Sequence, residues 1–480
     1  MIEPTTPIPP HPTSQPFVRI IARALNKAIS AFANSFRRPG GLIGICVIIS
    51  CAGCGGGDGG SNDAVETRSF LMGSTPFFTH FDGSRIVFPD WRFENLDDRD
   101  LLSLHVDDFW GVPWDYCDAG TCSNLPQPWV DQWRQLASDA KRTGKPLYLA
   151  VSPLGERRTL APKVLPDGST QEGWNPLIDS EGCYRFDSDT KAADYKASYI
   201  TYLKYLIDLV DPNYFSPAIE INIPFARCPQ QKVAWIAWYN DVQTEVKAAY
   251  PKLIVFPTFQ LEHMYGIAAA ASACGSDTVT ECFDSRLSEA LTIPADRIAF
   301  SSYPAPWTYH AEFNHSFPRD TLSKVAQATD KQIWISETGW PAIPVLSSYA
   351  HGASGSCGDA LLPSKINVAG VGELDLANDK AQAEYIAWLV NEAQYQNVEA
   401  VVWWLNRDYL DGAVTGNETC PCVPEGNSTC LLLDHFYGAG GAAGEVLLRS
   451  FGNMALRYYD GTPRPGQATW HEYLSRRYQP

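Results

Sequence analysis

Two glutamates stand out as residues that could do chemistry. Glu337 ends the apolar run "IWISE" (333–337) and precedes a Thr-Gly-Trp-Pro turn, and Glu220 lies within "AIEIN" (218–222). A carboxylate at the end of a buried strand is costly unless it has a partner or a chemical task. Two carboxylates that face each other across a cleft can cleave a glycosidic bond. We therefore expect Glu337 to act as the nucleophile and Glu220 as the general acid/base.

Aromatic and amide side chains near other strand ends would complete a carbohydrate-binding cleft. Indole rings offer flat apolar surfaces for the C–H faces of sugar rings, and amides can hold the hydroxyl groups. The predicted substrate-binding residues are Asn222, Gln260, Glu262, Tyr303, Trp307, Trp340, Trp404 and Asn406. Glu262 is also an alternative acid. This chemistry needs no cofactor, and we expect no metal site, because His105 and Asp107 are explained more simply as hydrogen-bonding each other.

The elements that must position these residues alternate regularly along the chain. Strand-like runs are predicted at 69–78, 101–110, 146–153, 218–225, 253–262, 297–304, 332–341 and 398–408, with helix-like segments between them and after the last. The runs are largely apolar, as expected for strands buried on both faces. Eight β/α units predict an α/β protein with a (β/α)₈ barrel, whose active site lies at the carboxyl ends of the strands. An open doubly wound sheet is the alternative, but no G-x-G-x-x-G motif follows the first strand.

The motifs at these strand ends resemble those of glycoside hydrolase clan A. "WISETGWP" (334–341) looks like the strand-7 nucleophile motif of the family 17 β-1,3-glucanases. "AIEIN" and "FSSYPAPW" (300–307) are similar to the strand-4 and strand-6 motifs of the family 53 endo-β-1,4-galactanases, and Trp403–Trp404 matches the strand-8 aromatic. The resemblance covers roughly residues 69–478. It implies a retaining mechanism with two carboxyl groups about 5 Å apart.

The sequence departs from the clan at one informative position. The clan has Asn immediately before the strand-4 glutamate, where it holds the 2-hydroxyl of the reacting sugar, but this chain has Ile219. Asn222, two residues after Glu220, is not equivalent. The departure keeps open an alternative function, a non-catalytic carbohydrate-binding lipoprotein on the same barrel.

Composition and charge narrow the range of partners. The chain has 480 residues, of which 45% are apolar and 19% charged, and its formal net charge is -17. Nucleic acids and acidic membrane surfaces repel such a protein, so a neutral carbohydrate is the expected partner. There is no G-x-S-x-G elbow and no P-loop. We expect a monomer that contacts a membrane only through a lipid anchor.

The N-terminal segment predicts that anchor. Arg37 and Arg38 precede the apolar run "LIGICVIIS" (42–50), which is too short for an ordinary membrane-spanning helix. "IISC" ending at Cys51 resembles the bacterial lipoprotein signal, with Cys54 as the second candidate for lipidation. The predicted organisation is an extension and signal at 1–51, a flexible Gly-rich linker at 52–66 and the barrel domain at 67–480. The predicted location is extracytoplasmic, on a bacterial membrane.

Cysteine usage predicts the same compartment. The chain has 13 cysteines, and ten of them lie in the body of the protein, clustered in loop-like sequence. An even, clustered set is typical of extracytoplasmic disulfides. The plausible local pairs are Cys117–Cys122, Cys274–Cys282 and a bridge from Cys420 or Cys422 to Cys430.

Overall fold

The computed structural model describes most of the chain after the N-terminal segment. The described residues are 66–76, 80–81, 86–87, 93–106, 110–118, 120–155, 159–171, 173–174, 177–179, 182–187, 190–266, 278–305, 319–346, 360–408 and 449–480. The predicted signal, the lipidation site at Cys51, the linker up to residue 65 and Trp307 lie outside these ranges.

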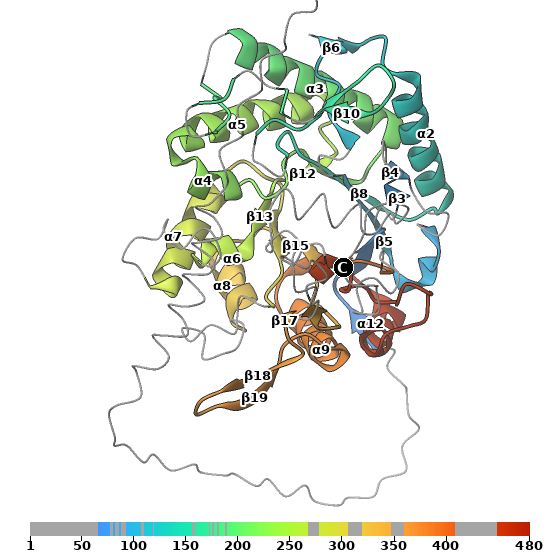
Figure 1. The fold of residues 1–480 in the computed structure, drawn as a ribbon, viewed down its shortest axis with the longest axis vertical. Coiled ribbons are helices and arrows are strands. Elements are labelled where there is room, and N and C mark those ends of the chain that lie inside the picture. Colours follow the sequence, from blue (N-terminus) through green and yellow to red (C-terminus); the bar gives the residue numbers. More distant parts are fainter. Residues whose placement is uncertain are drawn as a thin grey trace, which may run out of the picture.

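A closed parallel barrel forms the centre of the molecule (Figure 1). Its strands, in chain order, are β2 (Leu71–Thr75), β5 (Leu101–Val106), β8 (Leu147–Val151), β11 (Tyr214–Ser216), β12 (Ile254–Val255), β13 (Thr258–Gln260), β14 (Ile298–Ser302), β15 (Ile333–Thr338) and β20 (Val398–Trp404). The sheet begins with β12 and ends with β13, and every neighbouring pair within it is parallel. Because β12 and β13 are two parts of one stretch, 254–260, the sheet closes on itself. The (β/α)₈ barrel predicted from the sequence is confirmed.

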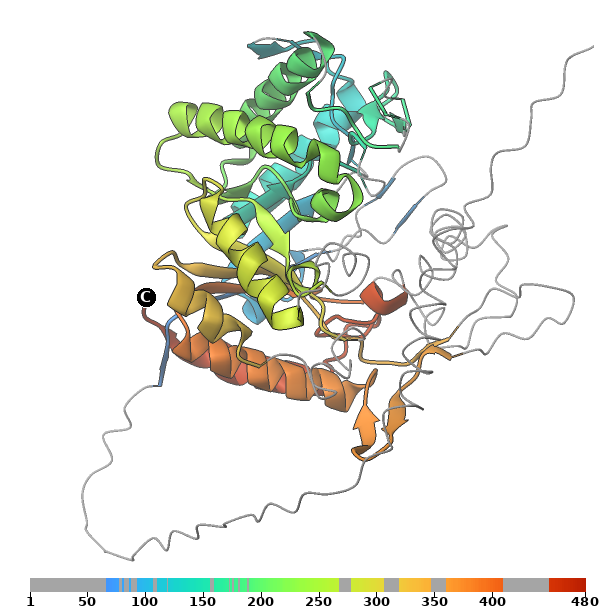
Figure 2. The same ribbon diagram turned by 90° about the vertical axis from the view of Figure 1, so that its left-hand side faces the viewer.

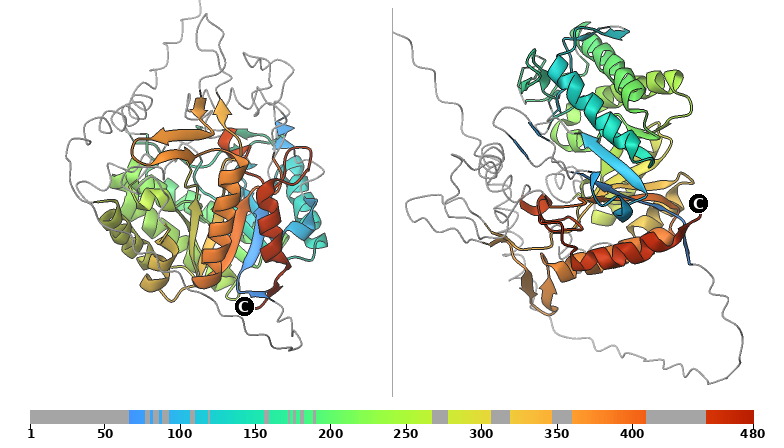
Figure 3. Two further views of the ribbon diagram at one scale, coloured as in Figure 1. Left: turned by 90° about the horizontal axis from the view of Figure 1, so that it is seen from below. Right: turned by 90° about the vertical axis from the view of Figure 1, so that its right-hand side faces the viewer.

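Helices surround the barrel in the predicted order. They are α2 (Gln127–Arg142), α3 (Thr190–Val210), α4 (Ile223–Arg227), α5 (Lys232–Ala249), α6 (Leu261–Met264), α7 (Val279–Thr292), α8 (Thr321–Ala328), α9 (Asp379–Tyr395) and α12 (Pro465–Ser475), with 3-10 turns η2 (Leu96–Asp98) and η4 (Pro229–Gln231). Helices α9 and α12 lie side by side beneath the sheet (Figure 3). Between β2 and β5, the described residues contain only the turn η2 in place of a first helix.

Pairs of short strands lie outside the barrel sheet. They are β1 (Thr67–Arg68) with β21 (Arg477–Tyr478), β3 (His80–Phe81) with β4 (Ile86–Val87), β6 (Cys117–Asp118) with β7 (Thr121–Cys122), β9 (Lys163–Val164) with β10 (Thr170–Gln171), β16 (Val345–Leu346) with β17 (Ala360–Leu362), and β18 (Lys365–Val368) with β19 (Gly372–Asp375). The β18–β19 hairpin extends away from the barrel (Figure 2). None of the described helices combines the length and apolar character that a membrane span requires.

Side chains of the barrel strands alternate between two separate cores. Those that point inward form a cluster around Tyr148, Phe256 and Trp334, whose ring centroids lie 5.1 to 5.7 Å apart. Those that point outward pack against the helices in a much larger cluster. The interior is therefore filled below the strand ends, as expected for a barrel of this size, and only the carboxyl ends of the strands are left to build a site.

Strand 4 lies earlier in the chain than the sequence predicted. The prediction placed it at 218–225, but β11 covers Tyr214–Ser216 and α4 begins at Ile223. The segment 218–222 is a turn that leaves the barrel rim. The prediction was wrong because this turn has the apolar, β-branched composition of a strand, and Pro217 does not by itself show where the strand ends.

Two disulfides are fully described. Cys117–Cys122 joins β6 to β7, as predicted, and Cys183–Cys228 joins the loop before α3 to the end of α4, which the sequence did not predict. Cys282 is also disulfide-bonded. Its predicted partner, Cys274, lies outside the described residues, as do Cys420, Cys422 and Cys430.

Candidate active site

A β-bulge near the end of β15 turns Glu337 toward the barrel mouth. Phe300 of β14 pairs with Ile335, but the next residue, Ser301, pairs with Glu337, so Ser336 is an extra residue on β15. The Ser336 hydroxyl donates to the Phe300 carbonyl at 2.9 Å, which satisfies an acceptor where the ladder is interrupted. Bulges of this kind re-aim side chains and are common beside active sites.

The bulge changes which face Glu337 occupies. Trp334 belongs to the inner cluster and Ile335 to the outer one, so strict alternation would point residue 336 inward and residue 337 outward. Instead Glu337 contacts groups at the mouth, and Thr338 contacts Tyr385 of α9 on the outer side. One additional residue on β15 thus turns Glu337, the predicted nucleophile, toward the barrel mouth.

Two side chains hold the Glu337 carboxylate from either side. The Tyr303 hydroxyl donates to Oε1, and His105 Nδ1 lies 3.0 Å from Oε2. Only 8% of Glu337 is exposed. The pKa of the buried Tyr148 hydroxyl, inside the barrel, is raised first by burial and second by the negative charge of Glu337. His105 was predicted to hydrogen-bond Asp107, which lies outside the described residues. The inward alternation of Leu101, Ser103 and His105 along β5 accounts for its contact with Glu337.

Glu220 stands in the turn after β11 with a left-handed backbone. Its φ is 48°, a conformation that costs a non-glycine residue about 1 to 3 kcal/mol unless the surroundings enforce it. Thr258 of β13 provides that enforcement. Its Oγ1 accepts from the Glu220 amide at 2.8 Å, its carbonyl accepts from the Ile221 amide at 2.9 Å, and its amide donates to the Ala218 carbonyl at 3.0 Å.

Ser301 links the two glutamates. Its hydroxyl donates to Glu220 Oε1 at 2.6 Å, and its Cα is the ladder partner of Glu337. Adjacent strands of a sheet lie about 4.8 Å apart. Ser301 holds the Glu220 carboxylate and is paired with Glu337. The two carboxylates therefore lie at neighbouring positions of the same rim. Ser301 was not predicted, since a serine in an apolar strand carries no signal of its own.

Aromatic rings border the glutamates on the side of β20. The Trp404 ring packs edge-on against His105, with centroids 5.3 Å apart. Phe451 lies against both Tyr303 and Trp404, at 4.8 and 5.9 Å. Phe451 was not predicted, because it follows a long insertion that has no strand or helix pattern. Tyr303 and Trp404, which were predicted, belong to the site.

Asn222 and Gln260 bond to each other and to neighbouring groups of the rim, and their contact with substrate stays a prediction. The Asn222 amide donates to the Gln260 carbonyl and accepts from its amide, at 2.9 and 2.8 Å, and so pairs with β13 as a peptide group would. The Gln260 side chain caps α6 by accepting from the His263 amide at 2.7 Å and donates to Glu262. With both ends of each amide engaged, these residues fix the rim that carries Glu220.

Glu262 lies on the outer side of the sheet, which excludes it as the alternative acid. Its carboxylate accepts from the Ser302 hydroxyl at 2.8 Å and from Gln260 Nε2 at 2.5 Å, and only 3% of the residue is exposed. Ser302 alternates with the inward-facing Ser301 and Tyr303 and therefore faces the helices. Burial raises the pKa of Glu262 to about 7, although its hydrogen bonds oppose this shift.

Trp340 and Asn406, both predicted to bind substrate, are buried, and Trp340 lies against α9 rather than at the mouth. Trp340 is 2% exposed, donates its indole N–H to the Leu376 carbonyl at 2.9 Å and packs on Tyr385. Asn406 is 0% exposed, and its main-chain amide donates to the Thr75 carbonyl at 3.1 Å. Both follow directly from strands that end at the rim, but the chain turns them into the core.

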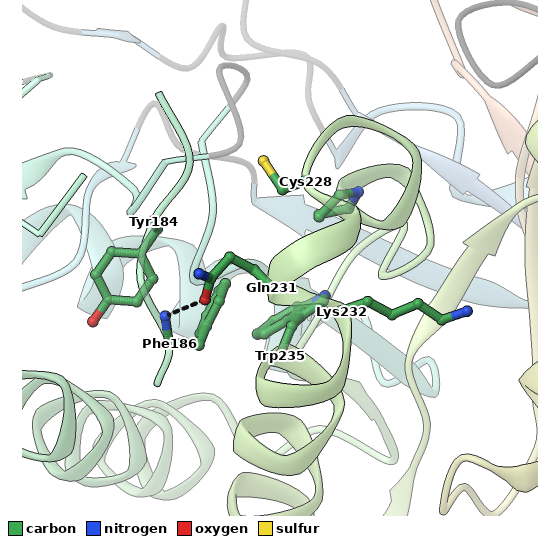
Figure 4. Close-up of a pocket in the computed structure, with 7 residues that line it drawn as sticks. Tyr184, Phe186, Cys228, Gln231, Lys232 and Trp235 are labelled. Carbon is green, nitrogen blue, oxygen red and sulfur yellow. Dashed lines mark hydrogen bonds between the residues drawn. The ribbon is translucent and has the colours of Figure 1, made fainter. Parts of the chain in front are cut away.

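A small pocket elsewhere in the described residues is too small for a sugar. It is lined by Tyr184, Phe186, Cys228, Gln231, Lys232 and Trp235 and has a volume of about 10 Å³ (Figure 4). That volume accommodates about one water molecule. Gln231 spans the pocket to accept from the Phe186 amide at 3.1 Å. Among the described residues, no group of three or more His, Cys, Asp or Glu side chains is arranged to hold a metal ion.

Comparisons with known proteins found similarity only at the level of solved structures. No family model matches the chain, and no curated protein matches it. Similar structures include a GH5_18 from Bifidobacterium longum subsp. infantis, with 12% identity, coverage of 86% of this chain and 80% of that one, and a TM-score of 0.46. GH5_18 from Streptomyces cattleya in complex with GlcNAc has 13% identity, coverage of 86% and 83%, and a TM-score of 0.45. The exo-β-1,4-mannosidase Op5Man5 from Opitutaceae bacterium strain TAV5 has 12% identity, coverage of 86% and 61%, and a TM-score of 0.44. Likenesses of this size carry no information about catalysis, so the function proposed below depends only on residues of this chain.

Proposed function

We propose that the protein is a retaining glycoside hydrolase that cleaves β-linked oligo- or polysaccharides. The observation that carries the proposal is the pairing of two glutamates through one residue: Ser301 holds the Glu220 carboxylate and stands opposite Glu337 on the neighbouring strand. Retaining enzymes need two carboxyl groups about 5 Å apart, whereas inverting enzymes need a wider gap for water. Neighbouring positions on one barrel rim favour the retaining arrangement.

Each carboxyl group has surroundings suited to its proposed role. Tyr303 and His105 both contact the Glu337 carboxylate and aim it, so that an oxygen can attack the anomeric carbon as the glycosidic C–O bond breaks. Glu220 donates its proton to the departing oxygen. In the second step Glu220 takes a proton from water, whose oxygen bonds to the anomeric carbon and releases Glu337. Trp404 and Phe451 provide the apolar wall beside the reacting sugar.

A hydrolysis screen tests the proposal directly. Purified protein would be assayed against β-glucans, β-galactans and β-mannans, with Glu337→Gln and Glu220→Gln beside it. We expect one polysaccharide class to be cleaved and Glu337→Gln to abolish cleavage, because an amide cannot form the glycosyl ester. Activity that survives Glu337→Gln would refute the assignment of the nucleophile.

A binding protein without turnover is the second candidate, and Ile219 is the residue that favours it. Ile219 packs in the inner cluster of the barrel, so an apolar side chain occupies the position before the proposed acid/base. Oligosaccharide binding without hydrolysis across the panel would support this candidate. For either function we propose an extracytoplasmic, lipid-anchored protein; the disulfides of the described residues support that compartment.

A further inference from the structure

The Glu220 carboxyl group is held by strands other than its own. The turn that carries it has no regular secondary structure, and a glutamate side chain has three rotatable bonds between Cα and the carboxyl group. Ser301 donates to Oε1 from β14, and this serine is only 1% exposed. Thr258 fixes the backbone from β13 through its hydroxyl and main chain. Two hydroxyl groups therefore restrain the residue, one at each end of its side chain.

We propose that Ser301 is a positioning residue for acid/base catalysis by Glu220, with Thr258 as its backbone counterpart. The inference rests on the proposed function and deepens it. Because the Ser301 hydroxyl donates to Oε1, that oxygen is an acceptor, and the acid form of Glu220 carries its proton on Oε2. Ser301 thereby determines which oxygen protonates the glycosidic bond and where that oxygen lies.

The dependence of the rate on the leaving group separates this role from a general structural one. Protonation of the glycosidic oxygen matters most when the leaving group is a poor one, such as an alkoxide, and little when it is a dinitrophenolate. A residue that positions the acid should therefore affect kcat/KM for poor leaving groups selectively. A residue that merely stabilises the barrel should affect both kinds of substrate equally.

The experiment uses the full chain and aryl and alkyl β-glycosides of the sugar identified by the hydrolysis screen. We expect Ser301→Ala to lower kcat/KM for the alkyl glycoside about 10- to 100-fold, as expected when general acid catalysis is impaired, and for the 2,4-dinitrophenyl glycoside less than about threefold. Ser301→Thr, which keeps the hydroxyl, should restore most of the lost activity. Glu220→Gln should show the same selectivity in a stronger form.

Thr258 provides a second, independent pair of variants. Thr258→Val is nearly isosteric but cannot accept from the Glu220 amide, whereas Thr258→Ser can. The valine variant should show the same leaving-group selectivity and the serine variant should not. This pair decides the question if Ser301→Ala does not fold, as judged by near-UV circular dichroism.

Each outcome has a definite meaning. Equal losses on both substrates, or no loss, in folded Ser301→Ala and Thr258→Val would overturn the positioning role while leaving the glycosidase intact. Wild-type protein that hydrolyses none of the substrates would overturn the proposed function, and this inference with it.

Discussion

Buried Glu262 should make the stability of the protein fall between weakly acidic and neutral pH. Burial raises its pKa from the ordinary 4.5 to about 7. Within that interval the folded protein keeps a proton that the unfolded chain releases, so the free energy of unfolding decreases as pH rises. An interval of about 2.5 pH units corresponds to about 3 kcal/mol. The destabilisation is absent below about pH 4.5, develops between pH 4.5 and 7, and is constant above pH 7.

Glu262→Gln removes the titration while nearly preserving the shape of the side chain. The glutamine keeps one acceptor for the Ser302 hydroxyl but sets its own NH₂ group against Gln260 Nε2, which costs about 1 to 2 kcal/mol at every pH. The change in the pH dependence of the unfolding free energy can therefore be separated from the loss that is constant with pH. We expect the difference in unfolding free energy between about pH 5 and pH 8 to shrink by about 2 to 3 kcal/mol relative to wild type.

Urea-induced unfolding, followed by tryptophan fluorescence across this pH range, measures the difference. Glu384→Gln is the matched control, because Glu384 is an exposed glutamate on α9 with 65% of its side chain accessible. It should leave the wild-type pH profile unchanged. If Glu262→Gln shows the same pH profile as wild type, the buried carboxyl group is not the source of the effect and the reasoning fails.

Three further predictions concern the site and its supports. Tyr303→Phe removes the hydroxyl that donates to Glu337, the proposed nucleophile, and should lower kcat/KM about 10- to 100-fold, or about 1.5 to 3 kcal/mol, in steady-state assays. Trp340→Phe should lower the unfolding free energy by about 1 to 2 kcal/mol, through loss of the bond to Leu376, without changing KM for an oligosaccharide; a raised KM would restore its predicted contact with substrate. Removing Cys183–Cys228, which closes a loop with a sequence separation of 45, should cost about 4 kcal/mol in urea unfolding, about twice the cost of removing the β6–β7 bridge.

The barrel could be predicted because parallel strands buried on both faces leave a strong pattern. Short apolar runs separated by amphipathic helices need only their order to indicate the topology, and seven of the eight predicted runs overlap the observed strands. Strand 4 failed, since β11 covers only Tyr214–Ser216 and the following turn is as apolar as a strand. That turn is stabilised by Thr258 and by the amide of Asn222, contacts between distant parts of the chain that no local pattern records.

The substrate-binding residues were predicted less well for a related reason. Side chains at the barrel mouth and side chains buried in the core can have the same residue type and the same position after a strand. Trp340 and Asn406 follow strand ends just as Tyr303 does, but they are buried against other elements. Glu262 and Glu220 both follow barrel strands, but Glu262 lies in α6 on the outer side of the sheet and Glu220 lies in a turn at the rim. Which way each loop turns depends on packing with helices far along the sequence.

The position of Glu337 shows where motif and periodicity disagree. Alternation along β15 carries Trp334 inward and would carry Ser336 inward and Glu337 outward, into the helix layer. Alternation alone would thus select Ser336, and not Glu337, as the residue that points inward at the end of β15. The bulge instead turns Glu337 toward the barrel mouth. The hydrogen bond from the Ser336 hydroxyl to the Phe300 carbonyl replaces the ladder contact that the extra residue removes. A small hydroxyl side chain beside the proposed nucleophile is therefore part of what presents the carboxylate, because a larger apolar residue would leave that buried carbonyl without its donor.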